Sequence, residues 1–210
     1  MICRILIAED HPVVRQGFRA LLEAAGHQVV GEAGNGREAC DLAGALQPNI
    51  ALLDLAMPLL NGIDASREIQ RVSPQTKTIL LTAHVERSFV LEALRANVRG
   101  YVLKIQAADD LLRALQEVMH GAVYISPNVA ACLVDAALGK VQAADEVLTA
   151  RERQVLQLVA EGRSTKGCAS ILGISVKTAE AHRNRIMQKL DIHQTAGLVH
   201  YAIRRGLTPL

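Results

Sequence analysis

Aromatic residues are scarce in this chain of 210 residues, which has no tryptophan, two phenylalanines and three tyrosines. Half of the residues are nevertheless hydrophobic, so a sizeable core can form. That core must be built of leucine, isoleucine, valine and alanine. The length leaves room for one or two domains.

Cysteines are also few and scattered, at positions 3, 40, 132 and 168, with no Cys-x-x-Cys pair. This spacing argues against a disulfide framework or a metal site, so we expect reduced, buried thiols. No segment approaches the roughly 18 consecutive apolar residues of a membrane span. Residues 1–5 lack the organisation of a signal peptide. We therefore expect a cytoplasmic protein that does not bind membranes.

Net charge is low, at +2 for the whole chain, but its distribution is uneven. Residues 1–121 hold 12 Lys and Arg against 14 Asp and Glu, a net of −2. Residues 148–210 hold 10 against 4, a net of +6. An acidic first part and a basic last part suggest two modules, the second of which meets a polyanion. The expected division is a domain over 1–121, a linker over 122–147 and a domain over 148–210.

Strand-like and helix-like segments alternate along the first module. Short apolar runs predict five strands, at residues 2–8, 28–33, 50–54, 76–83 and 100–104. Amphipathic spacing predicts helices over 13–25, 36–46, from 61 onward, 87–97 and 107–119. This alternation is typical of an α/β fold, a doubly wound five-stranded parallel sheet with right-handed crossovers. In the linker, Ser126-Pro127-Asn128 can open a short helix through Leu138.

Carboxylates end two of the predicted strands: Glu9 and Asp10 follow the first, and Asp54 ends the third. Ile50 to Leu53 is a continuous apolar run, as in a strand buried on both faces. The C-terminal ends of neighbouring parallel strands lie about 4.8 Å apart, so these carboxylates should converge. Taken alone, Asp54 is more simply a turn-capping residue. Converging oxygen ligands favour a hard cation such as Mg²⁺.

Two more predicted strand ends supply Thr82, a hydroxyl donor, and Lys104, an ammonium group. Alone, Thr82 is a good strand former and Lys104 a solvated charge. Beside an acidic metal site, the two together suit a bound phosphoryl group. Asp54 would be the nucleophile that forms an aspartyl phosphate. Mg²⁺ and Lys104 would offset the charge on the phosphoryl oxygens.

These residues, together with Met57-Pro58, Gly62 and Ala83, resemble the receiver domain of two-component response regulators across residues 1–121. The resemblance implies that a histidine kinase transfers a phosphoryl group to Asp54. The Mg²⁺ ligands that it implies are Glu9, Asp10, Asp54 and the backbone carbonyl of Ala56. It also implies that Thr82 hydrogen-bonds the phosphoryl group and that Tyr101 is an aromatic switch that turns inward behind it. One departure is Ile105, because many receivers have proline directly after the lysine.

The basic module shows only helical patterns, at about 150–160, 165–172, 176–190 and 194–205. Thr149 and Glu152 have the spacing of a capping box before the first helix. The third helix should turn Val176, Ala179, Ile186 and Leu190 inward and a polar face outward. A short helix, a turn with Gly173 and a longer polar-faced helix predict a helix-turn-helix, whose second helix enters the DNA major groove. A solvated basic helix is the plainer alternative, and the preceding turn and the +6 charge weigh against it.

Residues 148–205 resemble a LuxR-type DNA-binding domain, as in the NarL/FixJ subfamily of response regulators. The matching residues include Leu148-Thr149, Arg151-Glu152, Val155-Leu156, Ala160-Glu161-Gly162, Ala169, Leu172, Ile174-Ser175, His182, Ile186 and Leu190. The chain departs from the family at Thr165, Gly167, Cys168 and Ala179.

The resemblance directs Glu180, Ala181 and Asn184 toward base edges, and the chemistry of these side chains agrees with that role. The residues that would meet phosphates and supply sequence-independent affinity are Lys166, Lys177, Thr178, Arg183 and Lys189.

The two modules together predict a transcription regulator, not an enzyme, that is switched by phosphorylation of Asp54 and binds double-stranded DNA as a homodimer. We hypothesise that the unphosphorylated receiver covers the recognition helix. One alternative is a phospho-independent regulator with a structural receiver. Another is an aspartyl-phosphate phosphatase, but such enzymes typically carry an acid two residues after the nucleophile, where this chain has Ala56.

Overall fold

The computed structural model describes residues 2–83, 87–104, 107–131, 148–205 and 207–208. Its first part is a parallel sheet in the order β2-β1-β3-β4-β5-β6. The strands are β1 (Arg4–Ala8), β2 (Gln28–Ala33), β3 (Ile50–Asp54), β4 (Lys77–Thr82), β5 (Gly100–Leu103) and β6 (Tyr124–Ile125). The doubly wound α/β class is confirmed, but within the described residues the sheet has six strands where the sequence predicts five. The additional strand, β6, lies in the segment expected to be linker.

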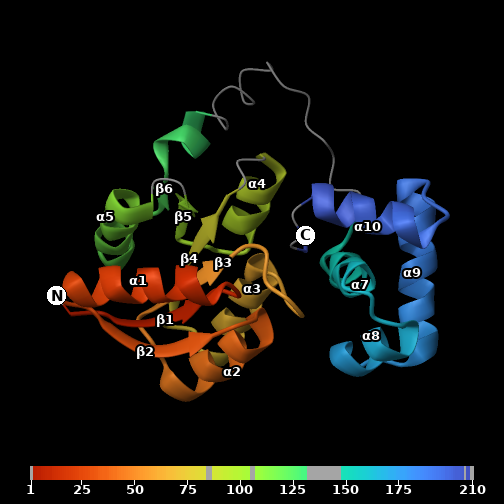
Figure 1. The fold of residues 1–210 in the computed structure, drawn as a ribbon, viewed down its shortest axis with the longest axis horizontal. Helices are drawn as coiled ribbons and strands as arrows, with labels where there is room; N and C mark the ends of the chain where they lie inside the picture. Colours follow the sequence, from red (N-terminus) through yellow and green to blue (C-terminus); the bar gives the residue numbers. More distant parts are fainter. Residues whose placement is uncertain (1, 84–86, 105–106, 132–147, 206, 209–210) are drawn as a thin grey trace.

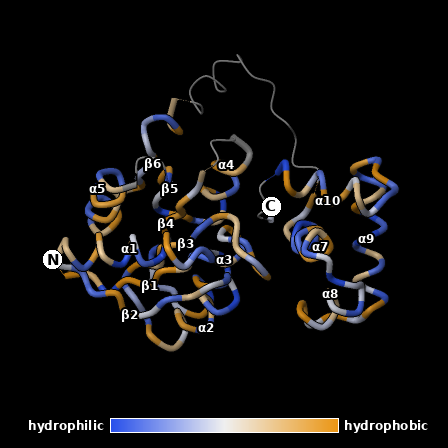
Figure 2. Tube along the Cα trace, in the orientation of Figure 1, coloured by the Kyte–Doolittle hydropathy of each residue, from blue (hydrophilic) through white to orange (hydrophobic). Residues whose placement is uncertain are grey.

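Helices cover both faces of this sheet (Figure 1). On one face, α1 (Pro12–Ala24) and α5 (Ala107–Met119) contribute Phe18, Leu22 and Leu115 to a core shared with β1 and β3. On the other face lie α2 (Gly36–Leu46), α3 (Gly62–Val72) and α4 (Arg87–Arg95). The side chains of Ile5–Ala8 and Ile50–Leu53 are almost fully buried, which explains their continuous apolar runs. Figure 2 shows the corresponding hydrophobic strands at the centre of this layer.

The second part is helical, with α7 (Ala150–Ala160), α8 (Thr165–Leu172), α9 (Val176–Leu190) and α10 (Thr195–Arg204) over residues 148–205. The capping box before α7 is present, because Thr149 and Glu152 each bond the other's backbone amide. Gly173 ends α8 with φ of +62°, a left-handed conformation that glycine adopts at little cost. The sequence therefore predicts this helix-turn-helix correctly.

The inward face of α9 differs in one residue from its prediction. Ala179 and Ile186 are buried, and Leu190 is half-buried, but Val176 is 43% exposed. Val176 is the first residue of the helix and directly follows the turn that separates α8 from α9. A helical wheel gives the direction of a side chain but not how far the packing extends.

The segment after α5 is helical from Pro127 to residue 131, and the remainder of the helix expected through Leu138 lies outside the described residues. Cys3, Cys40 and Cys168 are buried free thiols, and Cys132 is not among the described residues. Within the described ranges, no helix combines the length and apolarity required to cross a bilayer.

Candidate functional site

The predicted acidic residues do meet at the C-terminal edge of the sheet. β1 and β3 pair in parallel with Ala8 opposite Leu53, so that Glu9 and Asp54 leave adjacent strands side by side. Glu9 is fully buried and Asp54 is 4% exposed. Burial raises the pKa of the Asp54 carboxyl, and the nearby Glu9 carboxylate raises it further. Two buried carboxylates of like charge need a cation between them.

Lys104 supplies such a cation. Its Nζ lies 2.7 Å from Glu9 Oε2 and 2.9 Å from Asp54 Oδ2. Burial by itself would lower the pKa of Lys104, but Asp54 and Glu9 together raise it above its usual value. The ammonium group is therefore protonated and bridges the predicted nucleophile and a predicted metal ligand.

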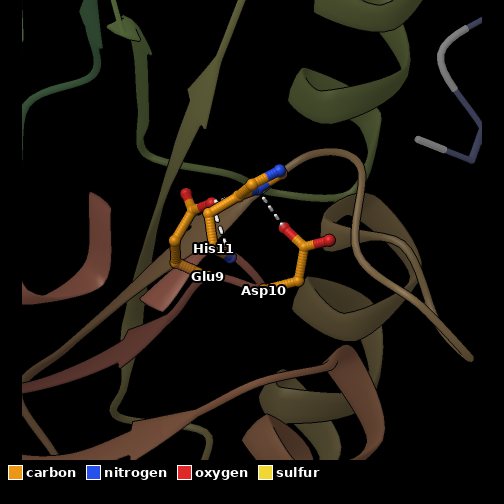
Figure 3. A group of neighbouring side chains, drawn as sticks. All are labelled: Glu9, Asp10 and His11. Carbon is orange, nitrogen blue, oxygen red and sulfur yellow. Dashed lines mark hydrogen bonds and ion pairs between the residues drawn. The ribbon is translucent and has the colours of Figure 1, made fainter. Parts of the chain in front are cut away.

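Asp10 faces a residue that the sequence reasoning missed, His11 (Figure 3). The Nδ1 atom of His11 lies 2.7 Å from Asp10 Oδ1 and 3.1 Å from Glu9 Oε1. One ligand atom from each of these three residues falls within a 4.8 Å group that could hold a metal ion. The negative charge of Asp10 is the largest cause that raises the pKa of His11. Its place directly after Asp10 was the signal that could have identified it.

The acidic oxygens fit a hard cation. Glu9 Oε2 and Asp10 Oδ1 are buried and make no hydrogen bond of good geometry among the described residues. Among the described residues, ion pairs with Lys104 and His11 offset their charge. Carboxylate oxygens in this state are the ligands that Mg²⁺ prefers.

The other predicted residues of the site lie in the loop after Asp54 and on strands β4 and β5. The backbone amide of Ala56 hydrogen-bonds the Asp54 carboxylate and favours its ionised form. Thr82 ends β4 fully buried, and its partner on β5, Leu103, immediately precedes Lys104. Tyr101 lies on β5 with 2% of its surface exposed, so its ring is inward in this structure.

Gly62 lets the chain turn closely past Asp54. A Cβ atom on Gly62 would lie 2.3 Å from the Asp54 carbonyl oxygen, so any side chain there would displace the end of β3. The Gly62 amide bonds the Leu55 carbonyl at 2.9 Å and closes the loop of residues 55–61. The sequence motif that contains Gly62 is therefore explained by this close approach.

The loop that follows Asp54 is bound by α7 of the helical domain. Gln157 Nε2 donates to the Met57 carbonyl at 2.7 Å, and Gln157 Oε1 accepts from the Asn61 amide at 3.2 Å. Glu161 Oε1 accepts from the Leu59 amide at 3.1 Å. Burial raises the pKa of Glu161. The buried hydrophobic residues of the α2–α4 face and of the helical domain belong to one continuous cluster.

A second contact joins α7 to α4. Arg153 on α7 donates to the Glu92 carboxylate on α4, and Arg67 on α3 bonds the same carboxylate at 3.1 Å. Glu92 is 5% exposed, and its burial raises its pKa against the effect of the two arginines. A buried carboxylate between two guanidinium groups is strongly destabilised if either partner is removed.

The hypothesis that the receiver covers the recognition helix is wrong for this structure. α7 packs against the receiver, whereas α9 lies on the far side of the helical domain (Figure 1). On α9, Lys177, Thr178, Glu180, Ala181 and Asn184 are all exposed. The opposite charges of the two modules suggested the covered arrangement, but the contact is made by α7, through the polar groups of Arg153, Gln157 and Glu161 and through buried hydrophobic residues.

The remaining residues predicted to contact DNA differ in exposure and in their intramolecular partners. Lys166 is exposed on α8. Arg183 is half-buried, and its Nη2 donates to Thr195 Oγ1 at 2.6 Å. Lys189 Nζ lies 2.7 Å from Glu152 Oε2, within the capping box of α7. Arg183 and Lys189 thus have intramolecular partners, while Lys166 and the exposed residues of α9 are accessible.

A parallel sheet with this acidic edge, joined to a helix-turn-helix, defines a response regulator that acts on DNA. The family model described as "Response regulator receiver domain" matches residues 5–116. The model described as "Bacterial regulatory proteins, luxR family" matches residues 146–202. The chain belongs to the response regulators with a LuxR-type DNA-binding domain.

Full-length relatives agree with this assignment. The chain is 36% identical over 206 residues to the transcriptional regulatory protein MctR of Rhizobium johnstonii, covering 97% of this chain and 94% of MctR. It is 35% identical to the oxygen regulatory protein NreC of Staphylococcus carnosus, covering 97% of this chain and 98% of NreC. The structure of RcsB from Salmonella enterica serovar Typhimurium, bound to promoter P1flhDC in the presence of the phosphomimetic BeF3⁻, is similar with a TM-score of 0.71 and 29% identity. That comparison covers 96% of this chain and 98% of the RcsB chain.

Proposed function

We propose that this protein is a transcription regulator of a two-component system, in which Asp54 accepts a phosphoryl group from a sensor histidine kinase. The observation that carries the proposal is the Lys104 ammonium, held within hydrogen-bonding distance of both Glu9 and Asp54 at the ends of three strands. The phosphorylated protein binds double-stranded DNA as a homodimer. Both events belong to the cytoplasm in this proposal, because the DNA is there.

The chemistry is a phosphoryl transfer between two side chains. An oxygen of the ionised Asp54 carboxylate attacks the phosphorus of the kinase phosphohistidine, the P–N bond breaks, and the imidazole leaves with the electron pair and takes up a proton. Lys104 and the Thr82 hydroxyl face the phosphoryl oxygens. Glu9, Asp10, Asp54 and the Ala56 carbonyl would hold Mg²⁺, which supplies positive charge beside those oxygens.

DNA recognition is assigned to α9 and its surroundings. Glu180, Ala181 and Asn184 are the proposed base contacts, and their exposure leaves them free to enter a major groove. Lys166, Lys177 and Thr178 are the proposed phosphate contacts. Arg183 and Lys189 can join them only by exchanging their present partners for phosphate oxygens.

The regulatory link runs through the loop of residues 55–61. This loop leaves Asp54 at one end and is held by Gln157 and Glu161 of α7 at the other. A phosphoryl group on Asp54 moves the loop and α4, and so weakens the contact with α7 and frees the helical domain to dimerise on DNA. The switch acts on the position of the domain rather than by covering α9.

The decisive experiment incubates the protein with acetyl phosphate and Mg²⁺ and reads the intact mass. We expect one added phosphoryl group, and none in Asp54→Asn. The phosphorylated protein should bind DNA more tightly than either unphosphorylated form. Equal DNA binding by wild type with and without the phosphodonor would favour the phospho-independent alternative.

The enzyme alternative is tested in the same samples. Sustained release of phosphate from a range of phosphate esters, over many turnovers per Asp54, would indicate a phosphatase. We expect instead one phosphorylation per chain followed by slow hydrolysis.

A further inference from the structure

The structure places Ser126, in the segment expected to be linker, against the strand end that carries Lys104. We propose that Ser126 is a positioning residue for Lys104, whose hydroxyl holds the end of β5 and the start of α5 and thereby fixes the ammonium group beside Asp54. The role of Lys104 in phosphoryl transfer rests on the proposed function. The position of Lys104 can be tested without it.

Ser126 is fully buried, and its amide and hydroxyl groups make three hydrogen bonds to β5 and α5. Its backbone amide donates to the Tyr101 carbonyl at 2.9 Å, which continues the pairing of β6 with β5. Its hydroxyl accepts from the Leu103 amide at 3.4 Å and donates to Asp110 Oδ2 at 2.7 Å. β6 ends at Ile125, so the Ser126 hydroxyl continues the ladder by one bond.

The direction of this hydroxyl is determined by Asp110. The Ser126 hydroxyl donates its proton to Asp110 Oδ2, and a lone pair remains for the Leu103 amide. Asp110 lies in the first turn of α5, where negative charge is favoured, and Tyr124 Oη also donates to it at 3.0 Å. Two hydroxyl groups from the β6 segment therefore bind the start of α5.

The hydrogen bonds of Ser126 reach the chain on both sides of Lys104. Leu103 directly precedes it, and α5 begins at Ala107, so Ser126 ties the two elements between which the lysine lies. Many receivers restrain this position with a proline, which fixes the backbone φ angle. This chain has isoleucine at position 105, which lacks the ring of proline. The Ser126 hydroxyl provides a restraint from outside the segment.

A plainer role for Ser126 is to cap the helix that begins at Pro127. A capping serine would accept with its hydroxyl from an amide two or three residues later. The hydroxyl of Ser126 is directed instead to Leu103 and Asp110, while its main-chain carbonyl accepts from the Val129 and Ala130 amides. The side chain thus serves β5 and α5 rather than its own helix.

The first test measures how well Lys104 is held in the metal-free protein. Amine acetylation at each lysine is followed by peptide mass spectrometry, with the exposed Lys177 as an internal reference. We expect Ser126→Ala to accelerate acetylation of Lys104 about 3- to 10-fold, the change expected from one hydrogen bond. Ser126→Thr, which keeps a hydroxyl, should retain the wild-type rate.

Ser66→Ala is the matched control, because Ser66 is equally buried and its hydroxyl bonds Thr78 at 2.7 Å, away from Lys104. An unchanged Lys104 rate in Ser126→Ala would overturn the proposal. So would an equal acceleration in Ser66→Ala, since that would indicate general loosening of the receiver.

The second test is a double-mutant cycle on phosphorylation by acetyl phosphate and Mg²⁺. Ser126→Ala should slow phosphorylation about 3- to 10-fold in the wild-type background and have no further effect in Lys104→Ala. The same loss in both backgrounds would contradict an action through Lys104. If the wild type is not phosphorylated at all, the proposed function fails, while the acetylation result still decides the positioning role.

Discussion

The side-chain amide of Gln157 donates to the Met57 carbonyl oxygen over 2.7 Å and so joins the DNA-binding domain to the loop behind Asp54. Met57 follows Ala56, whose carbonyl is one of the proposed Mg²⁺ ligands. The residue that α7 binds is therefore adjacent in the chain to a proposed metal ligand. This relationship makes the interface between the domains the first place to test the regulatory proposal.

Gln157→Ala should separate the domains of the unphosphorylated protein. Gln157 is 1% exposed and bonds both Met57 and Asn61, and each net hydrogen bond contributes about 1 kcal/mol. We expect the ratio of docked to separated molecules to fall about 10- to 100-fold. Small-angle X-ray scattering should then give a larger radius of gyration. Gln188→Ala, on the exposed face of α9, is the control, and an equal expansion there would refute the assignment.

The docked arrangement should weaken as the pH rises. Burial raises the pKa of Glu161, so the docked protein holds a proton more readily than the separated domains do. The stabilisation is complete below the ordinary glutamate pKa of about 4.3 and is lost as the pH passes through the raised value.

Glu161→Gln keeps an oxygen acceptor for the Leu59 amide but removes the charge. We expect this variant to dock more tightly at pH 7 and to show a smaller pH dependence in the same scattering measurement. A residual dependence should remain from Glu92, whose pKa is also raised by burial. An unaltered pH profile would show that Glu161 does not titrate with docking.

Two substitutions on α9 should separate base contacts from phosphate contacts. Glu180→Ala should relax specificity at one base pair, worth about 1–3 kcal/mol, with little change for other sequences. Lys177→Ala should lower the affinity for all sequences. It should also reduce by about 1 the magnitude of the slope of log K against log salt concentration. Titrations of matched and mismatched DNA at several salt concentrations give both quantities. The reverse pattern would mean that α9 docks in another orientation.

Lys189→Ala should cost stability as well as DNA affinity. Burial alone would raise the pKa of Glu152, but the bonds from Lys189 and Thr149 hold it below its ordinary range. The pair thus stabilises the fold above the ordinary glutamate pKa, and this contribution is lost as the pH falls through the depressed value.

Because the Lys189 side chain is partly exposed, solvent screening limits the expected loss to about 1 kcal/mol at pH 7, measured by urea unfolding. Lys177→Ala should leave the unfolding curve unchanged. Equal unfolding curves for Lys189→Ala and wild type would show that the pair contributes nothing.

The acidic edge could be predicted because its residues directly follow apolar runs. Parallel strands bring their C-terminal ends together, so a residue's place in the strand is enough to locate Glu9, Asp54 and Lys104. The helix-turn-helix could also be predicted from the sequence, because Thr149 is a local signal for the start of a helix and Gly173 for the end of one. In both cases the determinant lies within a few residues of the feature.

β6 and the contacts of α7 could not be predicted, because their determinants are distant in sequence. Tyr124–Ile125 is a two-residue strand, too short for a periodic pattern, and it pairs with the edge of β5, about 24 residues earlier in the chain. From the sequence alone, Gln157 would be expected on a polar helix face, exposed to solvent. It is buried only because Met57 and Asn61, about 100 positions away, present backbone groups to it.

The sixth strand also affects where this receiver can be cut from the full chain. A fragment that stops at Gly121 would keep the proposed phosphorylation site but lose the bonds from Ser126 to the Tyr101 carbonyl and the Leu103 amide, and so expose the edge of β5. Open edges recruit strands from other molecules. A fragment extended to residue 131 would retain Tyr124, Ser126 and the buried Val129, and we expect this longer fragment to remain monomeric at high concentration.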